Sequence, residues 1–233
     1  STLEKHHRVQ LLDEALEAGC KRLDLFFMTG LREQTYESVM GTVDYCARLL
    51  KKYAARSETR VIPFISPLAP FVDPGSRAFE EPGRYGYRLF CRTLEEHRRA
   101  LLAPSWKYVL NYETEWMNRD QIVASTYEAG RRLNLLKAEH GIVDAARAEA
   151  TDQRIARAVA LSKEIDHIMT LDDPEVQHAR LRALKPQVDC ANLSTVCDKR
   201  ELEAPLQQTG VNLVQAARVV VQEWWKGLAQ AAH

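Results

Sequence analysis

An apolar run that ends in a glycine turn decides how the first part of this chain folds. Residues 24–35 read Asp-Leu-Phe-Phe-Met-Thr-Gly-Leu-Arg-Glu-Gln-Thr. The dense apolar side chains of residues 23–28 are typical of a buried strand. Gly30 permits a tight turn or the close approach of a ligand, and Thr35 can cap the helix that follows. We expect Glu33 in the first turn of that helix, where the helix dipole favours a carboxylate.

The flanking segments place this run in an alternating pattern of helices and strands. Apolar residues recur every three to four positions over residues 3–18 and again over residues 38–53, which predicts two helices. A second strand is predicted at residues 60–66, where Pro63 is tolerable at an edge or a bulge. The order helix, strand, helix, strand is the signature of a parallel sheet covered by helices. Because two strands do not form a stable sheet of that type, we expect strands outside this chain, or another part of the chain, to cover the open edge.

The remainder of the chain has a different character. Residues 67–85 form a long stretch rich in proline and glycine, as in a functional loop or a domain junction. From Tyr87 onward the patterns predict almost only helix, with residues 106–116 as a short strand or a bent helix. The predicted helices cover residues 89–102, 119–140, 143–169, 174–185 and 211–231. We therefore predict an α/β part at residues 1–75 and a mainly helical accessory region at residues 76–233.

Composition argues against several classes of function. The chain carries 32 basic and 32 acidic side chains, and this balance gives no general attraction to nucleic acid or to anionic lipid. No apolar run approaches the roughly 20 residues that cross a bilayer, and the first residues lack the apolar stretch of a signal peptide. Five cysteines at wide spacings argue against a disulfide framework. We expect a cytoplasmic protein with no nucleic-acid or membrane partner, and the missing initiator methionine indicates a processed chain or a fragment.

The strand and turn at residues 24–35 resemble the fifth-strand segment of radical S-adenosylmethionine (SAM) enzymes. In that family an apolar strand leads into a Gly-Leu-Pro-Gly-Gln/Glu-Thr turn, and residues 30–35 read Gly-Leu-Arg-Glu-Gln-Thr. The looser family pattern Gly-x-Ile-x-Gly-x-x-Glu maps onto Phe26, Met28, Gly30 and Glu33. The glycine and glutamate are kept, whereas phenylalanine replaces the first glycine, methionine replaces isoleucine, and arginine replaces the proline of the turn.

Two further segments extend the resemblance to one group of that family, which carries an N-terminal cobalamin-binding domain. Residues 61–76 resemble the sixth strand and exit loop of that group, and residues 106–114 resemble its C-terminal region. The similarity is specific over residues 20–141 and weak beyond them.

The resemblance implies a partial (β/α)₆ barrel, in which a [4Fe–4S] cluster on a Cys-x₃-Cys-x₂-Cys loop cleaves SAM to a 5′-deoxyadenosyl radical or supports methyl transfer by cobalamin. No Cys-x₃-Cys-x₂-Cys sequence occurs in this chain, and clusters need thiolate ligands. The chain therefore resembles the C-terminal part of such an enzyme, and alone it should not perform the radical step. By the same resemblance, the backbone around Met28 and Gly30 lines the adenosyl and methionine parts of SAM, Glu33 completes the motif, and Ile65 and Ser66 approach the adenine. The substrate is an unidentified small molecule.

Other chemistry-bearing residues have plain structural interpretations. The aromatic residues within 106–116 could line a channel, but packing in the core is favoured. Glu113 and Glu115 are expected to be solvated or salt-bridged rather than a general acid/base pair. The arginine pairs at 98–99 and 131–132 could hold a phosphate, but solvated helix faces are commoner.

Two other functions stay open. One is a non-enzymatic module that associates with itself through its C-terminal helices, at residues 143–169 and at the helix that carries Trp224 and Trp225. The other is a small independent α/β enzyme, for which the sequence shows no nucleophile elbow, phosphate loop or metal quartet.

Overall fold

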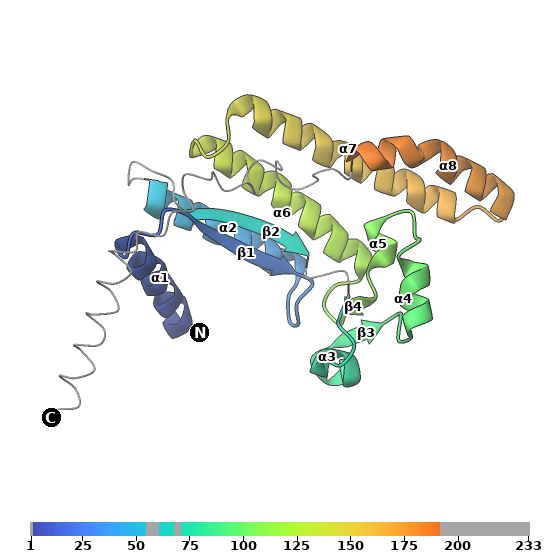
Figure 1. The fold of residues 1–233 in the computed structure, drawn as a ribbon, viewed down its shortest axis with the longest axis horizontal. Coiled ribbons are helices and arrows are strands. Elements are labelled where there is room, and N and C mark those ends of the chain that lie inside the picture. The colour runs from blue at the N-terminus through green and yellow to red at the C-terminus, as the bar shows by residue number, and fades with distance from the viewer. Residues whose placement is uncertain (1, 55–60, 68–70, 192–233) are drawn as a thin grey trace.

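The computed structural model describes residues 2–54, 61–67 and 71–191, with side chains for residues 10–53, 61–66 and 71–188. Figure 1 shows a mixed α/β fold that is mostly helical. In chain order the elements are α1 (Thr2–Glu17), β1 (Leu23–Thr29), α2 (Tyr36–Ala54), β2 (Val61–Pro67), α3 (Arg77–Glu80), the 3₁₀ helix η1 (Pro82–Tyr85), β3 (Tyr87–Leu89), α4 (Leu94–Ala100), α5 (Trp106–Val109), β4 (Tyr112–Thr114), α6 (Arg119–Glu139), α7 (Ala145–Met169) and α8 (Pro174–Ala191). The predicted helix at residues 211–231, with Trp224 and Trp225, lies outside the described residues.

The predicted parallel pairing of the first two strands is confirmed. β1 and β2 lie side by side in register, from Leu23 opposite Val61 to Thr29 opposite Pro67. Helix α2 connects them, so the predicted order of helix, strand, helix and strand is present. Within the described residues each of the two strands is an edge of the sheet, and an edge strand tolerates the proline at position 63.

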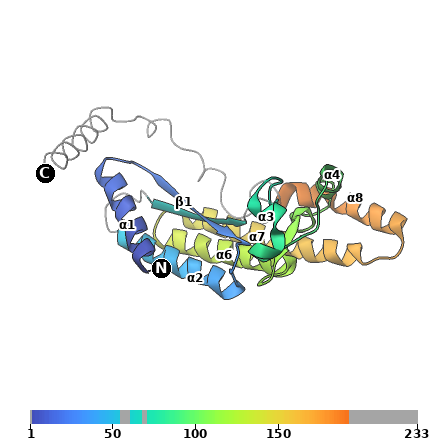
Figure 2. The same cartoon turned by 90° about the horizontal axis from the view of Figure 1, so that it is seen from below.

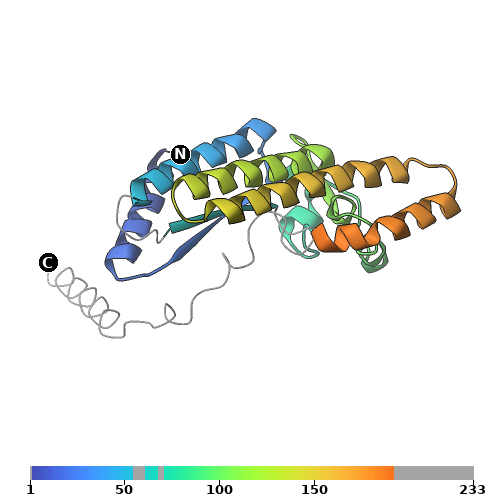
Figure 3. The same cartoon turned by 90° about the horizontal axis from the view of Figure 1, so that it is seen from above.

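Helices cover one face of this strand pair. Figures 2 and 3 show α2, α6 and α7 side by side in a layer on one side of β1 and β2. The largest buried cluster joins these helices to β2, and its apolar members include Val39, Val43, Ile65, Ile122, Leu133 and Ile155. One core therefore extends across residue 75, and the division of the chain at that residue stays a prediction.

The helix ends follow the capping signals in the sequence. Thr35 caps α2, because its hydroxyl accepts a hydrogen bond from the Ser38 amide at 3.2 Å. Asn118 and Gln121 form a reciprocal capping box at the start of α6. Gly141, with φ of 70°, follows the end of the same helix. These predicted ends are confirmed to within one or two residues.

The segment between residues 87 and 116 differs from the prediction. Leu89 belongs to β3, which pairs antiparallel with β4, so the helix expected from residue 89 begins only at Leu94, as α4. Residues 106–116 contain both of the alternatives that were left open, first the short helix α5 and then strand β4. Strands of three residues are too short to give a readable period-two pattern, and this is why β3 was missed.

The last described helix also differs from the prediction. Helix α8 continues through Pro186 to Ala191, whereas an end before Pro186 was expected. A proline inside a helix removes one hydrogen bond and can kink the helix without ending it. Figure 3 shows that the loop between α7 and α8 lies at the end of the molecule farthest from α1. Within residues 2–54, 61–67 and 71–191, no helix has the length and apolar character that a membrane crossing requires.

Candidate functional site

The predicted site residues on the two strands meet at one edge of the sheet. Because β1 and β2 are parallel and in register, their carboxyl ends lie together, with Met28 opposite Ser66 and Phe27 opposite Ile65. Gly30 follows directly after β1. The structure thus brings Met28, Gly30, Ile65 and Ser66 into one region, as the sequence predicted. We call this region the strand-end site.

The side chains of these residues face opposite ways. Met28, which is 48% exposed, and the half-buried Ser66 lie on the face of the pair that is turned away from the described helix α2. Ile65 is only 3% exposed and packs in the core beneath α2 and α6. The Ile65 side chain is therefore part of the strand core, and only its backbone can contact a ligand.

The turn after β1 is closed by a side chain that the sequence analysis did not single out. The Gln34 amide nitrogen donates to the Met28 carbonyl at 3.1 Å, and the Gln34 amide oxygen accepts from the Leu31 N–H at 3.2 Å. Gly30 adopts a φ of 81°, in the left-handed region that suits glycine. The signal in the sequence that could have identified Gln34 is its position between Gly30 and the capping Thr35.

Glu33 lies before helix α2 and not in its first turn, so that expectation is wrong. Helix α2 begins at Tyr36, and Glu33 has a φ of 61°, which is uncommon for a residue with a side chain. Its exposed carboxylate pairs with Arg32 Nε at 3.1 Å. The first-turn carboxylate is instead Glu37, whose pKa is lowered by a backbone hydrogen bond and then by the Thr35 hydroxyl.

Two segments from later in the chain, β3 and α6, hold this turn in place. The Tyr87 hydroxyl accepts a hydrogen bond from the Arg32 N–H at 3.1 Å. The hydroxyls of Thr29 and Thr126 are 2.7 Å apart, and Thr126 also donates to the Ile122 carbonyl. Since the single Thr126 proton is used there, Thr29 must be the donor to Thr126. Strand β3 and helix α6 therefore fix the two sides of the turn.

Tyr112 of β4 completes this support. The side chain is fully buried, and its ring packs against Tyr87 edge to face at 5.5 Å. A Cβ atom built on Gly30 would lie 2.5 Å from the Tyr112 hydroxyl, so no larger residue fits there without displacement. Burial raises the pKa of Tyr112, and it also raises the pKa of Tyr87. Both phenols are therefore neutral at ordinary pH.

The face of the sheet that is turned away from α2 carries exposed apolar side chains on β1. Phe26 is 58% exposed and stacks on Phe64, with ring centroids 5.1 Å apart and an interplanar angle of 17°. Met28 lies two residues further along the same face. Large apolar side chains exposed side by side on a sheet are typical of an interaction or ligand surface.

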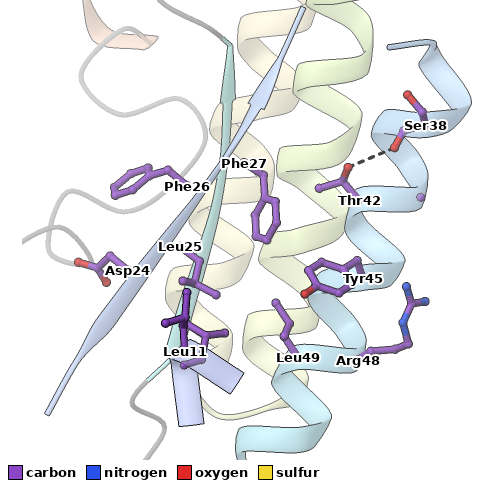
Figure 4. Close-up of a pocket in the computed structure, with 12 residues that line it drawn as sticks. Leu11, Asp24, Leu25, Phe26, Phe27, Ser38, Thr42, Tyr45, Arg48 and Leu49 are labelled. Carbon is purple, nitrogen blue, oxygen red and sulfur yellow. Dashed lines mark hydrogen bonds between the residues drawn. The ribbon is translucent and has the colours of Figure 1, made fainter. Parts of the chain in front are cut away.

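A groove of about 680 Å³ runs along β1 between α1 and α2. Figure 4 shows Leu25, Phe27, Tyr45 and Leu49 pointing toward one another between β1 and α2, while Phe26 points to the other side. The floor of the groove is thus mostly apolar.

The cysteines of the described part do not fit an iron–sulfur cluster. Cys20, Cys46 and Cys91 are free thiols. Burial raises the pKa of Cys46 to about 12, so this buried side chain is a neutral thiol rather than a thiolate. Within the residues that the structure describes, no group of three His, Cys, Asp or Glu side chains could hold a metal ion.

The alternative candidates from the sequence have structural partners. Glu113 forms an ion pair with Arg88, as expected for a salt-bridged carboxylate. The arginine pairs form ion pairs with carboxylates: residues 98 and 99 contact Glu95, residue 131 contacts Asp152, and residue 132 contacts Glu128. Trp106 donates its indole N–H to the Tyr127 hydroxyl at 2.7 Å, which agrees with packing of the aromatic cluster.

Asn111 anchors the segment that follows β2 and was not identified from the sequence. Its fully buried amide accepts from the Val72 N–H at 2.8 Å and donates to the Val72 carbonyl at 3.2 Å. The same amide nitrogen lies 2.9 Å from His97 Nε2, and His97 Nδ1 lies 2.8 Å from the Thr93 carbonyl. Because a carbonyl can only accept, His97 is protonated on Nδ1 and accepts from Asn111. A buried asparagine between two non-adjacent segments gives no local sequence signal.

Comparison of the chain with protein-family models, with curated proteins and with solved structures finds no match in any of the three. The fold and the site define a mixed α/β protein with a small parallel sheet and mostly helical structure. Any narrower assignment rests on the residues and contacts described above.

Proposed function

We propose that this chain is the C-terminal portion of a cobalamin-dependent radical SAM enzyme. The longer protein would cleave SAM or transfer a methyl group to a small molecule. In this proposal β1 and β2 are two neighbouring strands of a partial (β/α)₆ barrel, and the strand-end site contributes part of the SAM pocket. The proposal also places the protein in the cytoplasm, an assignment that the free thiols of Cys20, Cys46 and Cys91 favour.

The observation that carries the proposal is the exposure of two large apolar side chains on the face of β1 opposite to its packed face. Helices α2 and α6 pack on one face, while Phe26 and Met28 are exposed on the other. In a (β/α) barrel the helices lie outside and the opposite strand face lines the interior. Within the described residues β1 pairs only with β2, so the other edge of β1 and the groove beside it can accept a preceding strand and helix.

The residues of the strand-end site suit an adenosyl ligand. When bound, SAM supplies the methyl or 5′-deoxyadenosyl group. The exposed Met28 side chain offers an apolar contact, the Ser66 hydroxyl offers a hydrogen bond, and the backbone at Gly30 and Ile65 lies at the same edge. Glu33 has an exposed carboxylate that can accept hydrogen bonds from a ligand amine or hydroxyl. The chain's contribution is thus to bind and orient the ligand.

The cluster and cobalamin are assigned to polypeptide outside this chain. The described cysteines do not fit a [4Fe–4S] cluster. In the proposal, the three-cysteine loop and the cobalamin domain precede Ser1 in the longer protein.

The test is to express the chain together with the polypeptide encoded upstream of Ser1 and to reconstitute it with iron and sulfide without oxygen. The longer protein is expected to show iron–sulfur absorbance and to bind SAM, whereas the 233-residue chain alone shows neither. A longer protein that is folded but binds neither iron nor SAM contradicts the proposal.

A second candidate, self-association through the C-terminal helices, is favoured by a separate observation. The hairpin of α7 and α8 lies at one end of the molecule, and Met169 and Val176 are exposed near its loop. Light scattering over a range of concentrations tests this candidate. A mass that doubles with concentration supports it, and Val176→Lys should then reduce the association.

A further inference from the structure

A buried hydroxyl without a hydrogen-bond partner lies directly beneath the strand-end site. Tyr112 is 0% exposed, and its hydroxyl has no partner among the described residues. Buried polar groups are nearly always hydrogen-bonded, because a buried group without a partner loses its hydrogen bonds to water and gains no others. An exception at the edge of a candidate ligand site points to a partner that is supplied in another state of the site.

The hydroxyl faces the glycine of the turn. Gly30 lies against it, so close that a Cβ atom at position 30 would be 2.5 Å away. On one side of Gly30 the turn is anchored by the bond from Thr29 to Thr126, and on the other side by the two bonds of Gln34. Between these anchors Gly30, at a φ of 81°, can change its peptide orientation without a side-chain clash.

The neighbouring tyrosine provides an internal comparison. Tyr87 packs edge to face on Tyr112, and its hydroxyl already has a partner in the Arg32 N–H at 3.1 Å. Two phenols from adjacent strands therefore contact the same turn, one with a hydrogen bond and one without. If both tyrosines served only for packing, the buried hydroxyl of Tyr112 would destabilise the fold and would have no compensating role.

We propose that Tyr112 is a positioning residue of the strand-end site, an inference that rests on the proposed function. When an adenosyl ligand binds over the turn, the backbone at Gly30 shifts, and a turn carbonyl accepts a hydrogen bond from the Tyr112 hydroxyl. Tyr112 then holds the turn in its ligand-bound shape from the side opposite the ligand. The β3–β4 unit is thereby part of the binding site although it does not touch the ligand.

This role predicts that removing the Tyr112 hydroxyl lowers the affinity for the ligand without lowering the stability of the free protein. Tyr112→Phe removes an unpartnered group from the free protein, so the melting temperature should stay the same or rise. The same change removes the hydrogen bond of the bound state and should weaken ligand binding about 10-fold. Tyr87→Phe is the matched control, because it removes a hydroxyl that is already bonded and should lower the melting temperature.

The experiment measures S-adenosylhomocysteine binding to the longer protein by calorimetry, together with melting temperatures, for the wild type and the two variants. Weaker binding by Tyr112→Phe at an unchanged or higher melting temperature supports the positioning role. Equal binding by the wild type and Tyr112→Phe overturns that role and leaves the proposed function standing, as does weaker binding that follows a lower melting temperature. A wild type that binds no ligand overturns the proposed function and this inference with it.

Discussion

Strand β4 of the antiparallel sheet and strand β1 of the parallel sheet differ in how completely they are buried. Strand β4 is well covered: Tyr112 is 0% exposed, and the Thr114 hydroxyl accepts a hydrogen bond from the Met117 amide at 2.9 Å. In strand β1, by contrast, Phe26 is 58% and Met28 is 48% exposed on the face turned away from α2. Large apolar side chains exposed side by side are typical of an interaction surface. We therefore propose that further structure packs against β1.

The largest expected effect comes from the contact that joins the two sheets. Gly30→Val places a branched side chain in the left-handed region and against Tyr112, and should destabilise the chain by about 4 kcal/mol. Denaturant unfolding measures this loss. Gly41→Ala in α2 is the control, because nothing lies near a Cβ there and alanine favours a helix. Equal stability of the two variants would show that Gly30 is not constrained by Tyr112.

Asn111→Ala removes the bridge between the segment after β2 and helix α4. The buried N–H and C=O of Val72 and the ring of His97 lose their partners, so a loss of about 3 kcal/mol is expected. Urea unfolding measures it. Asn111→Asp should lose at least as much, because a carboxylate keeps the bond to the Val72 N–H but cannot donate to the Val72 carbonyl. A loss below about 1 kcal/mol for the alanine variant would mean that the bridge contributes little to the fold.

Cys46 should make the stability of the chain depend on alkaline pH. Its folded-state pKa is raised from 9.0 to about 12 by burial, so the folded state retains a proton that the unfolded state loses between those values. The stabilising contribution is complete below pH 9 and falls by up to about 1.4 kcal/mol per pH unit as the pH rises through this window. Urea unfolding at several pH values measures the slope, which Cys46→Ala should reduce. An identical slope in both proteins would rule out this contribution of Cys46.

Glu33→Gly should stabilise the chain by about 0.5–1 kcal/mol, because glycine adopts the φ of 61° without strain. The lost ion pair with Arg32 lies at the surface and contributes little. Thermal unfolding measures the gain, and Glu33→Ala, which keeps the strain and also loses the ion pair, should show none. A loss of stability in Glu33→Gly would mean that the carboxylate has a structural partner.

Phe26→Ser should have the smallest of these effects on the free energy of unfolding. A loss of less than about 1 kcal/mol is expected, because the ring is already largely exposed. Phe27→Ser is the comparison, since Phe27 faces α2 and packs on Tyr45 at 5.9 Å, and it should cost about 2–3 kcal/mol. Denaturant unfolding of the two variants measures the difference. Equal losses would mean that the two faces of β1 are equally buried.

The sequence predicted the parallel part of the fold well because its signals are local. An apolar run, a glycine and a capping threonine lie within twelve residues, and they place β1, the glycine of the turn and the cap of α2 correctly. The partners of the turn could not be predicted, because Tyr87, Tyr112 and Thr126 come from segments far along the chain. Glu33 was misplaced because its left-handed conformation is visible only in the backbone.

The central claim is that further polypeptide completes the sheet at the open edge of β1. Amide hydrogen exchange of β1 tests it most directly, when the chain is compared with the longer protein that includes the sequence upstream of Ser1. Alternate amides of β1 that do not bond to β2 should exchange rapidly in the chain and slowly in the longer protein, because a new strand accepts their hydrogen bonds. Exchange of these amides at the same rate in both proteins would contradict the claim.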